Sequence, residues 1–480
     1  MKLATAHQDF FINEPEKNRV KILRQDRIHI NDVPCFVEID GQRHVVSNFS
    51  AFGLAINSKT QWFTNSEYQE CPFMVDQFEI ASLHLKAVRN ELTEDDGYIV
   101  GFEVLSMPVP VEQVFALFES FKIIKSLEED LKISDLVPVP FREGVWRTKD
   151  YLESLKQKIT DLETSANKSS AMDYRNYEMT ICQFFSNYFT KFFVPVYDRL
   201  FQQLQGCDEI QKSASFKFFR ENMRKLIYEA PFANRVYSKP LGYAGDYEMM
   251  NLIYRSEVIG ESLFAKCLHY YLVNEPSAVA VKNRADYLQD KIVNIIKTNS
   301  TKDLKILSVA CGPAMEIQKI INENSDLLAN KNISIHLLDQ DESALKFTQR
   351  TLRNLANKHS LKIDIRMVHS AIKNVITRGL DEKYDLIYSA GLFDYLTDPV
   401  AQMAGSSLFK SLKKGGELII GNFNTGNPNK FIMAIALDWH LIYRSIEQMK
   451  GLFSHLEGTS TVEHEGTGIN LFYCTKKDAA

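Results

Sequence analysis

Glycine and proline are scarce in this sequence, with 21 and 14 among 480 residues, whereas the two together make up about 12 % of average proteins. Collagenous, linker-like and low-complexity proteins are therefore excluded, and we expect the chain to fold almost throughout. An excess of one charge is also lacking, because 56 Lys and Arg against 61 Asp and Glu leave a net charge of −5. This balance argues against a protein whose main task is to coat nucleic acid or anionic lipid.

Cysteines are few and unpatterned, and long apolar runs are missing. The seven cysteines are odd in number and include no C-x-x-C pair, so we expect neither a disulfide framework nor a metal site. The N-terminal segment MKLATAHQDF lacks the apolar stretch of a signal peptide, and the most apolar late run, residues 431–443, is interrupted by Asp438 and His440. We therefore expect a soluble, cytoplasmic protein without a membrane span.

The chain length corresponds to about three domains, and three patterns follow one another. Residues 18–107 contain short β-rich runs with an Asp40-Gly41 turn signal, which predicts a small β-barrel. Residues 111–300 have apolar residues at helical spacing, which predicts a helical connector and cap. Residues 301–480 alternate strand-like runs with helical segments, which predicts a Rossmann-like, doubly wound α/β sheet with an antiparallel last strand at its edge.

A phenylalanine-rich segment lies within the predicted helical region. Phe184, Phe185, Phe189, Phe192 and Phe193 recur at helical spacing, which favours a buried core. The alternative is an apolar channel for an acyl chain.

The first strand-to-helix crossover of the predicted sheet, residues 306–316, turns at Gly312. Ligands of such sheets lie beyond the carboxyl ends of the strands, beside this turn. A dinucleotide site needs G-x-G-x-x-G, but here the second glycine position is Ala314, and Pro313 lacks an N–H. The second strand ends in Asp339, whose carboxylate can accept hydrogen bonds from both ribose hydroxyls. The pattern therefore predicts a nucleoside ligand without phosphates.

The glycine turn, the acidic end of the second strand and a Lys413–Gly416 entry to the fifth strand stand in the order typical of one enzyme family. Over about residues 300–475 the chain resembles class I S-adenosylmethionine-dependent methyltransferases, which implies S-adenosylmethionine as the cofactor. The resemblance implies these contacts: Ala310, Gly312 and Ala314 to the methionine part, Asp339 to the ribose, His369, Ser370 and Ala371 to adenine, and residues 389–393, with Ser389 and Gly391, to the transferring methyl group.

A narrower resemblance rests on three blocks, residues 239–248, 394–396 and 422–444. They resemble the bacterial methyltransferases of 3-hydroxypalmitic acid methyl ester biosynthesis. This resemblance implies a small-molecule substrate with a fatty-acid-like carboxylate.

The first of these blocks is a loop with three turn-forming residues between predicted helices. Loops of this kind often cap a site, so we expect a lid in which Tyr243 or Asp246 touches the cofactor. The alternative is an ordinary helix–helix connection.

Two candidate catalytic residues lie after the fifth strand, on a predicted helix over residues 438–444. A hydroxyl substrate needs a base such as His440, whereas a carboxylate is already ionised at pH 7 and needs a cation such as Arg444. We favour Arg444 as the carboxylate anchor, with Trp439 and Tyr443 shaping an apolar entrance. The alternative for Arg444 is a surface or interdomain ion pair.

The N-terminal β-region carries two motifs, Arg24 with Arg27 and the run Asn48-x-Ser50-x-x-Gly53. They resemble the motifs of PilZ domains, bacterial receptors for cyclic di-GMP, over about residues 18–107. Arginines pair bidentately with guanine O6 and N7. Only two residues separate the arginines, where the family has three, and the alternative is a barrel that no longer binds the dinucleotide and serves for docking.

Together these patterns predict an S-adenosylmethionine-dependent O-methyltransferase, with cyclic di-GMP as a regulatory ligand and no nucleic-acid partner. One alternative is a hydroxyl O-methyltransferase. Another, motivated by Ser308, Ala310 and Ala314 in place of the family's usual residues, is a non-catalytic cyclic di-GMP effector with a decayed methyltransferase fold.

Overall fold

The computed structural model of the chain divides into two compact units, residues 1–132 and 133–480. The predicted helical cap and the predicted α/β sheet thus lie in one unit. The structure describes residues 28–29, 33–93, 97–166, 171–299 and 303–478.

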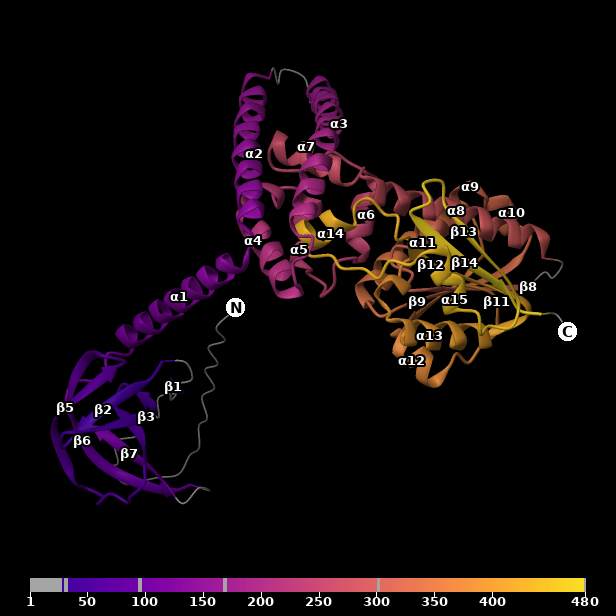
Figure 1. Cartoon of the computed structure of the whole chain (residues 1–480). Coiled ribbons are helices and arrows are strands. Elements are labelled where there is room, and N and C mark those ends of the chain that lie inside the picture. Colours follow the sequence, from indigo (N-terminus) through magenta and orange to yellow (C-terminus); the bar gives the residue numbers. More distant parts are fainter. Residues whose placement is uncertain (1–27, 30–32, 94–96, 167–170, 300–302, 479–480) are drawn as a thin grey trace. The chain divides into compact units, whose positions relative to one another are not determined.

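The N-terminal unit is a closed antiparallel β-barrel, as predicted (Figure 1). Its strand order is β3-β2-β5-β6-β7-β4, and β4 pairs back onto β3, while β1 pairs with β3 outside this ring. Asp40 and Gly41 form the predicted turn, with φ values of 50° and 72°, the left-handed pair that a tight hairpin needs. The strands are β1 (Ile28–His29), β2 (Cys35–Ile39), β3 (Gln42–Ser50), β4 (Gly53–Ser58), β5 (Glu67–Val75), β6 (Phe78–Leu92) and β7 (Tyr98–Val104).

Helix α1 (Val111–Leu136) follows the barrel, and its first turns pack against the barrel's core. Val114 is fully buried there, and Leu117, Phe118 and Phe121 pack against the same core. The helix is therefore part of the barrel's packing at its start.

A helical cap forms the first half of the second unit, and its core contains part of the phenylalanine-rich segment. Phe189 and Phe193 are buried, as a core interpretation predicts, whereas Phe184 is 64 % exposed. Helices α2 and α3 run side by side and pack together (Figure 1). The cap helices are α2 (Val139–Ser165), α3 (Ala171–Gln203), α4 (Glu209–Ile227), α5 (Pro231–Ser238), α6 (Tyr247–Arg255), α7 (Leu263–Leu272) and α8 (Pro276–Thr298).

The second half of this unit is a seven-stranded sheet in the order β10-β9-β8-β11-β12-β14-β13. The first five strands along the chain are parallel, and β14 is antiparallel to β12. The predicted antiparallel last strand is therefore correct in direction, but its place at the edge is wrong, because β13 pairs outside it. The strands are β8 (Asp303–Val309), β9 (Asn332–Asp339), β10 (Asp364–His369), β11 (Tyr384–Ser389), β12 (Leu412–Phe423), β13 (Thr459–His464) and β14 (Asn470–Lys476).

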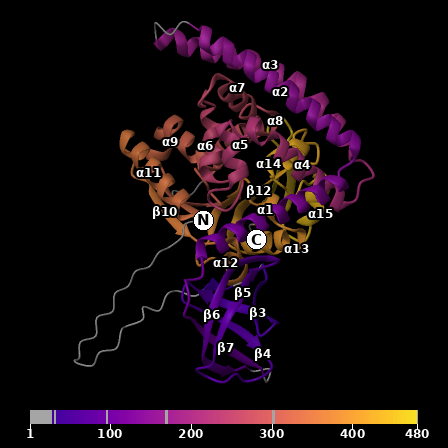
Figure 2. The ribbon, with the colours of Figure 1, turned by 90° about the vertical axis from the view of Figure 1, so that its left-hand side faces the viewer.

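Helices cover both faces of this sheet, which confirms the doubly wound class. Helices α8, α9 and α11 share one hydrophobic core with the sheet, and α12, α13 and α15 share the other. Figures 1 and 2 show these two groups on opposite faces. The bounds are α9 (Met315–Glu323), α10 (Ser325–Ala329), α11 (Glu342–Lys358), α12 (Ile372–Arg378), η1 (Phe393–Tyr395), α13 (Asp398–Lys410), α14 (Lys430–Leu437) and α15 (Ile446–Leu452).

Among the described helices, none combines the length and the apolar composition that a membrane-spanning segment requires.

Candidate active site

The turn between β8 and α9 is built from residues in the left-handed backbone conformation. Ala310, Gly312 and Ala314 have φ values of 53°, 50° and 49°. This conformation costs an L-residue about 1–2 kcal/mol, so the two alanines hold strain that glycine would not. A Cβ atom on Gly312 would meet nothing within 4 Å, so there is open space beside the turn. Glycine suits this position because of its left-handed backbone conformation.

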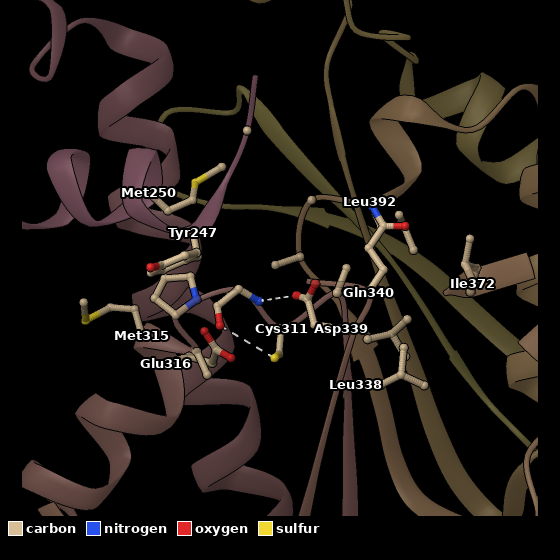
Figure 3. Close-up of a pocket in the computed structure, with 18 of the residues that line it drawn as sticks. Tyr247, Met250, Cys311, Met315, Glu316, Leu338, Asp339, Gln340, Ile372 and Leu392 are labelled. Atoms are coloured by element: carbon tan, nitrogen blue, oxygen red, sulfur yellow. Dashed lines mark hydrogen bonds between the residues drawn. The ribbon is translucent and has the colours of Figure 1, made fainter. Parts of the chain in front are cut away.

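Asp339, the last residue of β9, ties this turn to the second strand. Its Oδ2 accepts a hydrogen bond of 2.9 Å from the N–H of Gly312 (Figure 3). Its Oδ1 accepts one of 2.9 Å from the N–H of Asp341. Burial raises the pKa of Asp339, and these backbone hydrogen bonds act against that rise. A carboxylate has about four acceptor positions, so Asp339 keeps some capacity to accept from a ligand.

A pocket of about 270 Å³ lies beside this turn, at the carboxyl ends of β8, β9 and β11. This is where doubly wound sheets bind their ligands. Figure 3 shows Tyr247, Met250 and Met315 on one side of it and Leu392 and Ile372 on the other. The lining residues are Tyr243, Gly245, Tyr247, Met250, Tyr254, Arg284, residues 309–316, residues 338–340, Ser370, Ile372, residues 390–392 and Tyr395.

The loop between α5 and α6 forms part of the pocket wall, as expected of a lid. The Tyr243 hydroxyl donates a hydrogen bond of 3.3 Å to Oδ2 of Asp341, and burial raises the pKa of Tyr243. At Gly245 a Cβ atom would lie 2.5 Å from the hydroxyl oxygen of Tyr395. The lack of a side chain at Gly245 therefore lets the loop lie against the Tyr395 hydroxyl.

Asp246, the second residue predicted to touch the cofactor, does not line the pocket. It is buried and caps α6, where its Oδ1 accepts hydrogen bonds from the N–H of Met249 at 2.7 Å and from Nε of Arg235 at 2.8 Å. Its role is to fix the start of α6.

The structure brings most of the other predicted cofactor residues together. Ser389, however, is fully buried and donates to the carbonyl oxygen of Val309 at 2.9 Å. His369 lies with its Nε2 3.0 Å from the carbonyl oxygen of Gln340, on the exposed side of the strand end. Among the predicted cofactor residues, Ala310, Gly312, Ala314, Asp339, Ser370, Gly391 and Tyr243 line the pocket, whereas His369, Ala371, Ser389 and Asp246 do not.

Arg444, the predicted carboxylate anchor, is a buried structural residue outside the pocket, and it does not lie at the surface, where one form of the alternative placed it. It is 3 % exposed, and its guanidinium donates to the side chains of Asp398 and Asn422 and to the carbonyl oxygens of Phe393 and Leu396, at 2.6–3.1 Å. These bonds tie the end of β12 to η1 and α13. The prediction failed because partners already surround the group.

The predicted helix over residues 438–444 is also absent. Helix α14 ends at Leu437, because Asp438 takes the left-handed conformation with φ of 50°. His440 therefore shares no helical face with Arg444; its side chain is 61 % exposed and its Nε2 lies 3.2 Å from Oδ1 of Asp438. Trp439 is buried and donates from Nε1 to the Tyr395 hydroxyl at 2.8 Å, so it backs the pocket wall.

Sequence reasoning assigned no role to several polar residues of the pocket, among them Arg284 on α8, Glu316 on α9 and Tyr395 on η1. Glu316 is buried and accepts a 2.7 Å hydrogen bond from the Tyr388 hydroxyl, while burial raises the pKa of its carboxyl group. The available signal was a charged residue within an otherwise apolar helical face, at Arg284 among Val281, Ala285 and Leu288.

The barrel motif residues that the structure describes lie at the β3–β4 hairpin. Ser50 pairs with Gly53, and Asn48 pairs with Ala55 on the facing strand. The hydroxyl of Ser50 donates to the carbonyl oxygen of Gly53 at 3.4 Å. Arg24 and Arg27 lie outside the described residues.

The fold defines a Rossmann-like domain, and its pocket lies at the first crossover. Residues 300–467 match the family model described as a methyltransferase domain. This match covers about a third of the chain and confirms the predicted methyltransferase class for that part. No curated protein matches the chain.

Several solved structures are similar in part. A possible exported protein from Bordetella parapertussis is 17 % identical, with a TM-score of 0.40 over 49 % of this chain and 80 % of that chain. Magnesium protoporphyrin IX methyltransferase from Synechocystis, with bound S-adenosylhomocysteine, is 9 % identical, with a TM-score of 0.33 over 42 % and 88 %. An O-methyltransferase family protein from Burkholderia thailandensis is 11 % identical, with a TM-score of 0.30 over 44 % and 63 %. All three TM-scores lie below 0.5, so the assignment rests on the family match.

Proposed function

We propose that the second unit transfers a methyl group from S-adenosylmethionine to an oxygen atom of a small molecule bound in the pocket described above. The observation that carries this proposal is the cradle formed by the left-handed turn at Gly312 and the buried carboxylate of Asp339. The remaining acceptor capacity of the Asp339 carboxylate suits the ribose hydroxyls of a nucleoside, and the open space beside Gly312 lets a ligand lie against the turn. When bound, S-adenosylmethionine supplies an activated methyl group.

The protein's contribution to the reaction is the placement of both reactants, which must stand about 3–3.5 Å apart and in line. Residues 390–392 and Tyr395 border the pocket from the end of β11, and the α5–α6 loop closes it from the cap side. The walls of this pocket are mostly apolar. Positioning is therefore the main catalytic device in this proposal.

A carboxylate is the nucleophile that the pocket favours. Of the residues that the structure describes, no histidine lines the pocket, and a hydroxyl substrate would need a base. The two carboxyl groups of the pocket have other roles in this proposal: Asp339 holds the ribose, and Glu316 accepts a hydrogen bond from the Tyr388 hydroxyl. A carboxylate is ionised at pH 7 and requires no base. This agrees with the fatty-acid-like substrate implied by the resemblance to 3-hydroxypalmitic acid methyl ester biosynthesis.

The experiment is a transfer assay with the purified full chain, methyl-labelled S-adenosylmethionine and a matched pair of substrates. Hexadecanoate and hexadecan-1-ol share one chain and differ in the nucleophile. We expect label in the methyl ester of hexadecanoate and none in an ether of hexadecan-1-ol. The reverse result supports a hydroxyl O-methyltransferase, and a chain that binds no S-adenosylhomocysteine refutes the enzymatic proposal.

For the N-terminal barrel, we propose binding of cyclic di-GMP at the β3–β4 hairpin, with Arg24 and Arg27 as the guanine ligands. The support is the placement of Asn48, Ser50 and Gly53 together at this hairpin. Calorimetry with cyclic di-GMP should show micromolar binding that the double variant Arg24→Ala, Arg27→Ala abolishes. Arg43→Ala, an exposed arginine of β3 that pairs with Glu38, is the control and should bind normally.

No binding by the unaltered chain would favour the docking interpretation of the barrel. The double variant should retain its affinity for S-adenosylhomocysteine, because the cofactor pocket is lined by residues of the second unit alone.

A further inference from the structure

Two buried arginines of the second unit differ in the hydrogen-bond acceptors that surround their guanidinium groups. Arg444 donates to oxygen atoms through Nε and both Nη atoms, as described above. Arg284 is 6 % exposed, and its Nη2 donates at 3.4 Å to the sulfur of Met250, a weak acceptor. Its Nε is buried without a hydrogen-bond partner, and no carboxylate among the described residues lies within 4.0 Å of its guanidinium. Arg284 is thus a buried cation without a direct counter-ion.

The guanidinium of Arg284 packs against other residues of the pocket wall. A Cβ atom on Gly391 would lie 2.8 Å from Nη1 of Arg284, so the guanidinium rests against the backbone just after β11. The Tyr254 hydroxyl neighbours it, and Arg284 opposes the rise in the pKa of Tyr254 that burial causes. All these residues line the same pocket.

Two buried acids lie near Arg284, and both direct their oxygens to other donors. Glu316 accepts from the Tyr388 hydroxyl at 2.7 Å, and Oδ1 of Asp394 accepts from the N–H of Phe423 at 2.5 Å. Burial raises the pKa of each carboxyl group, and the positive charge of Arg284 acts against that rise. Arg284 therefore acts on both acids from a distance and forms an ion pair with neither. Burying a charged group without a paired partner is costly. A ligand that supplies the partner would remove this cost.

We propose that Arg284 binds a carboxylate group inside the pocket. A guanidinium presents five N–H donors in a planar fork that matches the two oxygens of a carboxylate. In Arg284 the Nε donor has no partner and Nη2 donates to a sulfur atom. The inference rests on the proposed function and deepens it. Two ligands of that function carry the required group: the amino-acid end of S-adenosylmethionine and a fatty-acid-like substrate.

The first arm of the test determines whether Arg284 binds the carboxylate of the cofactor. S-adenosylhomocysteine and 5′-methylthioadenosine share the nucleoside, but only the former carries the amino-acid carboxylate. Calorimetry with the full chain compares both ligands in the unaltered protein, Arg284→Met and Arg284→Lys. If the cofactor is the source, Arg284→Met binds S-adenosylhomocysteine at least about tenfold more weakly, as expected for a lost charged hydrogen bond, while affinity for 5′-methylthioadenosine stays unchanged.

The second arm determines whether Arg284 binds the carboxylate of the substrate. Hexadecanoate and hexadecan-1-ol are titrated into protein saturated with S-adenosylhomocysteine. If the substrate is the source, Arg284→Met loses about tenfold in affinity for hexadecanoate and none for hexadecan-1-ol. Lys291→Met is the matched control, because Lys291 is a cation on the same helix, paired with Glu463 at 2.7 Å and outside the pocket. This variant should bind all four ligands with the affinities of the unaltered protein.

Arg284→Lys keeps the test decisive if the methionine variant does not fold, because lysine retains the charge but lacks the fork. We expect it to lose affinity for the carboxylate ligand alone. The proposal is overturned if both variants keep all four affinities or lose them equally, since the latter marks a structural residue. An unaltered chain that fails to bind S-adenosylhomocysteine and 5′-methylthioadenosine overturns the proposed function itself.

Discussion

Replacing Asp339 by asparagine tests whether this carboxylate is both the support of the turn and the ribose ligand. In the protein, its two oxygens accept from the N–H groups of Gly312 and Asp341, each at 2.9 Å. Asparagine offers one oxygen and one NH2 group, so one of these N–H groups then faces another donor. An unsatisfied buried donor costs about 1–3 kcal/mol. We expect the free energy of unfolding to fall by about 2 kcal/mol.

The effect on ligand binding should exceed what this loss of stability explains. A hydrogen bond to a charged acceptor contributes about 1.5–3 kcal/mol, and the neutral amide lacks the charge that the ribose hydroxyls would meet. Affinity for S-adenosylhomocysteine should therefore fall about tenfold or more, as measured by calorimetry at a temperature where urea titration shows the variant folded.

Asp208→Ala is the control for stability alone. Asp208 caps α4 and accepts from the N–H of Gln211 at 2.8 Å, and it is not among the pocket residues. Its removal should cost about 0.5–2 kcal/mol and leave affinity for S-adenosylhomocysteine unchanged. An Asp339→Asn protein that binds within twofold of the unaltered chain would refute the assignment of Asp339 as a ligand.

Three further predictions concern strain, charge and pH. Ala310→Gly and Ala314→Gly should each raise the free energy of unfolding by about 0.5–1 kcal/mol, because relief of the left-handed strain exceeds the backbone entropy of glycine; urea titrations that show both variants weakened would contradict this. Arg444→Met should lower the free energy of unfolding by about 3 kcal/mol, since it strands several buried acceptors, whereas His440→Ala should stay within about 0.5 kcal/mol and keep methyl transfer; loss of transfer in His440→Ala would restore His440 as a base. Burial raises the pKa of Asp394 to about 6, so the folded protein retains a proton that the unfolded chain loses above about pH 4. The free energy of unfolding should therefore fall between pH 4 and pH 6, and Asp394→Asn should remove that slope; an unchanged slope would assign it to another group.

The fold class could be predicted from the sequence because its signals are local. The Asp40-Gly41 turn and the alternation of strands and helices after residue 303 depend on neighbouring residues only. The edge strand β13 escaped prediction, because its residues, TSTVEH, are mostly polar and exposed. A strand paired on one side, without a buried face, carries little hydrophobic pattern.

The site could be predicted only in part, for a similar reason. Gly312 and Asp339 stand at the ends of strands, and strand ends are visible in a sequence. Arg284 meets Gly391 only through packing of α8 against the sheet, a contact between residues far apart in the chain. The error at Arg444 arose from a helical pattern that continued past Leu437, where the left-handed Asp438 ends the helix.

The contribution of α6 and α8 to the pocket has a consequence for where selectivity is encoded. The matched methyltransferase domain begins at residue 300, yet Tyr247, Met250 and Arg284, which line the pocket, precede it. A fragment cut at that border would carry the turn and Asp339 but would lose one wall of the cavity. Exchange of residues 231–298 between related chains, with the sheet left intact, should therefore move ligand preference from one enzyme to another.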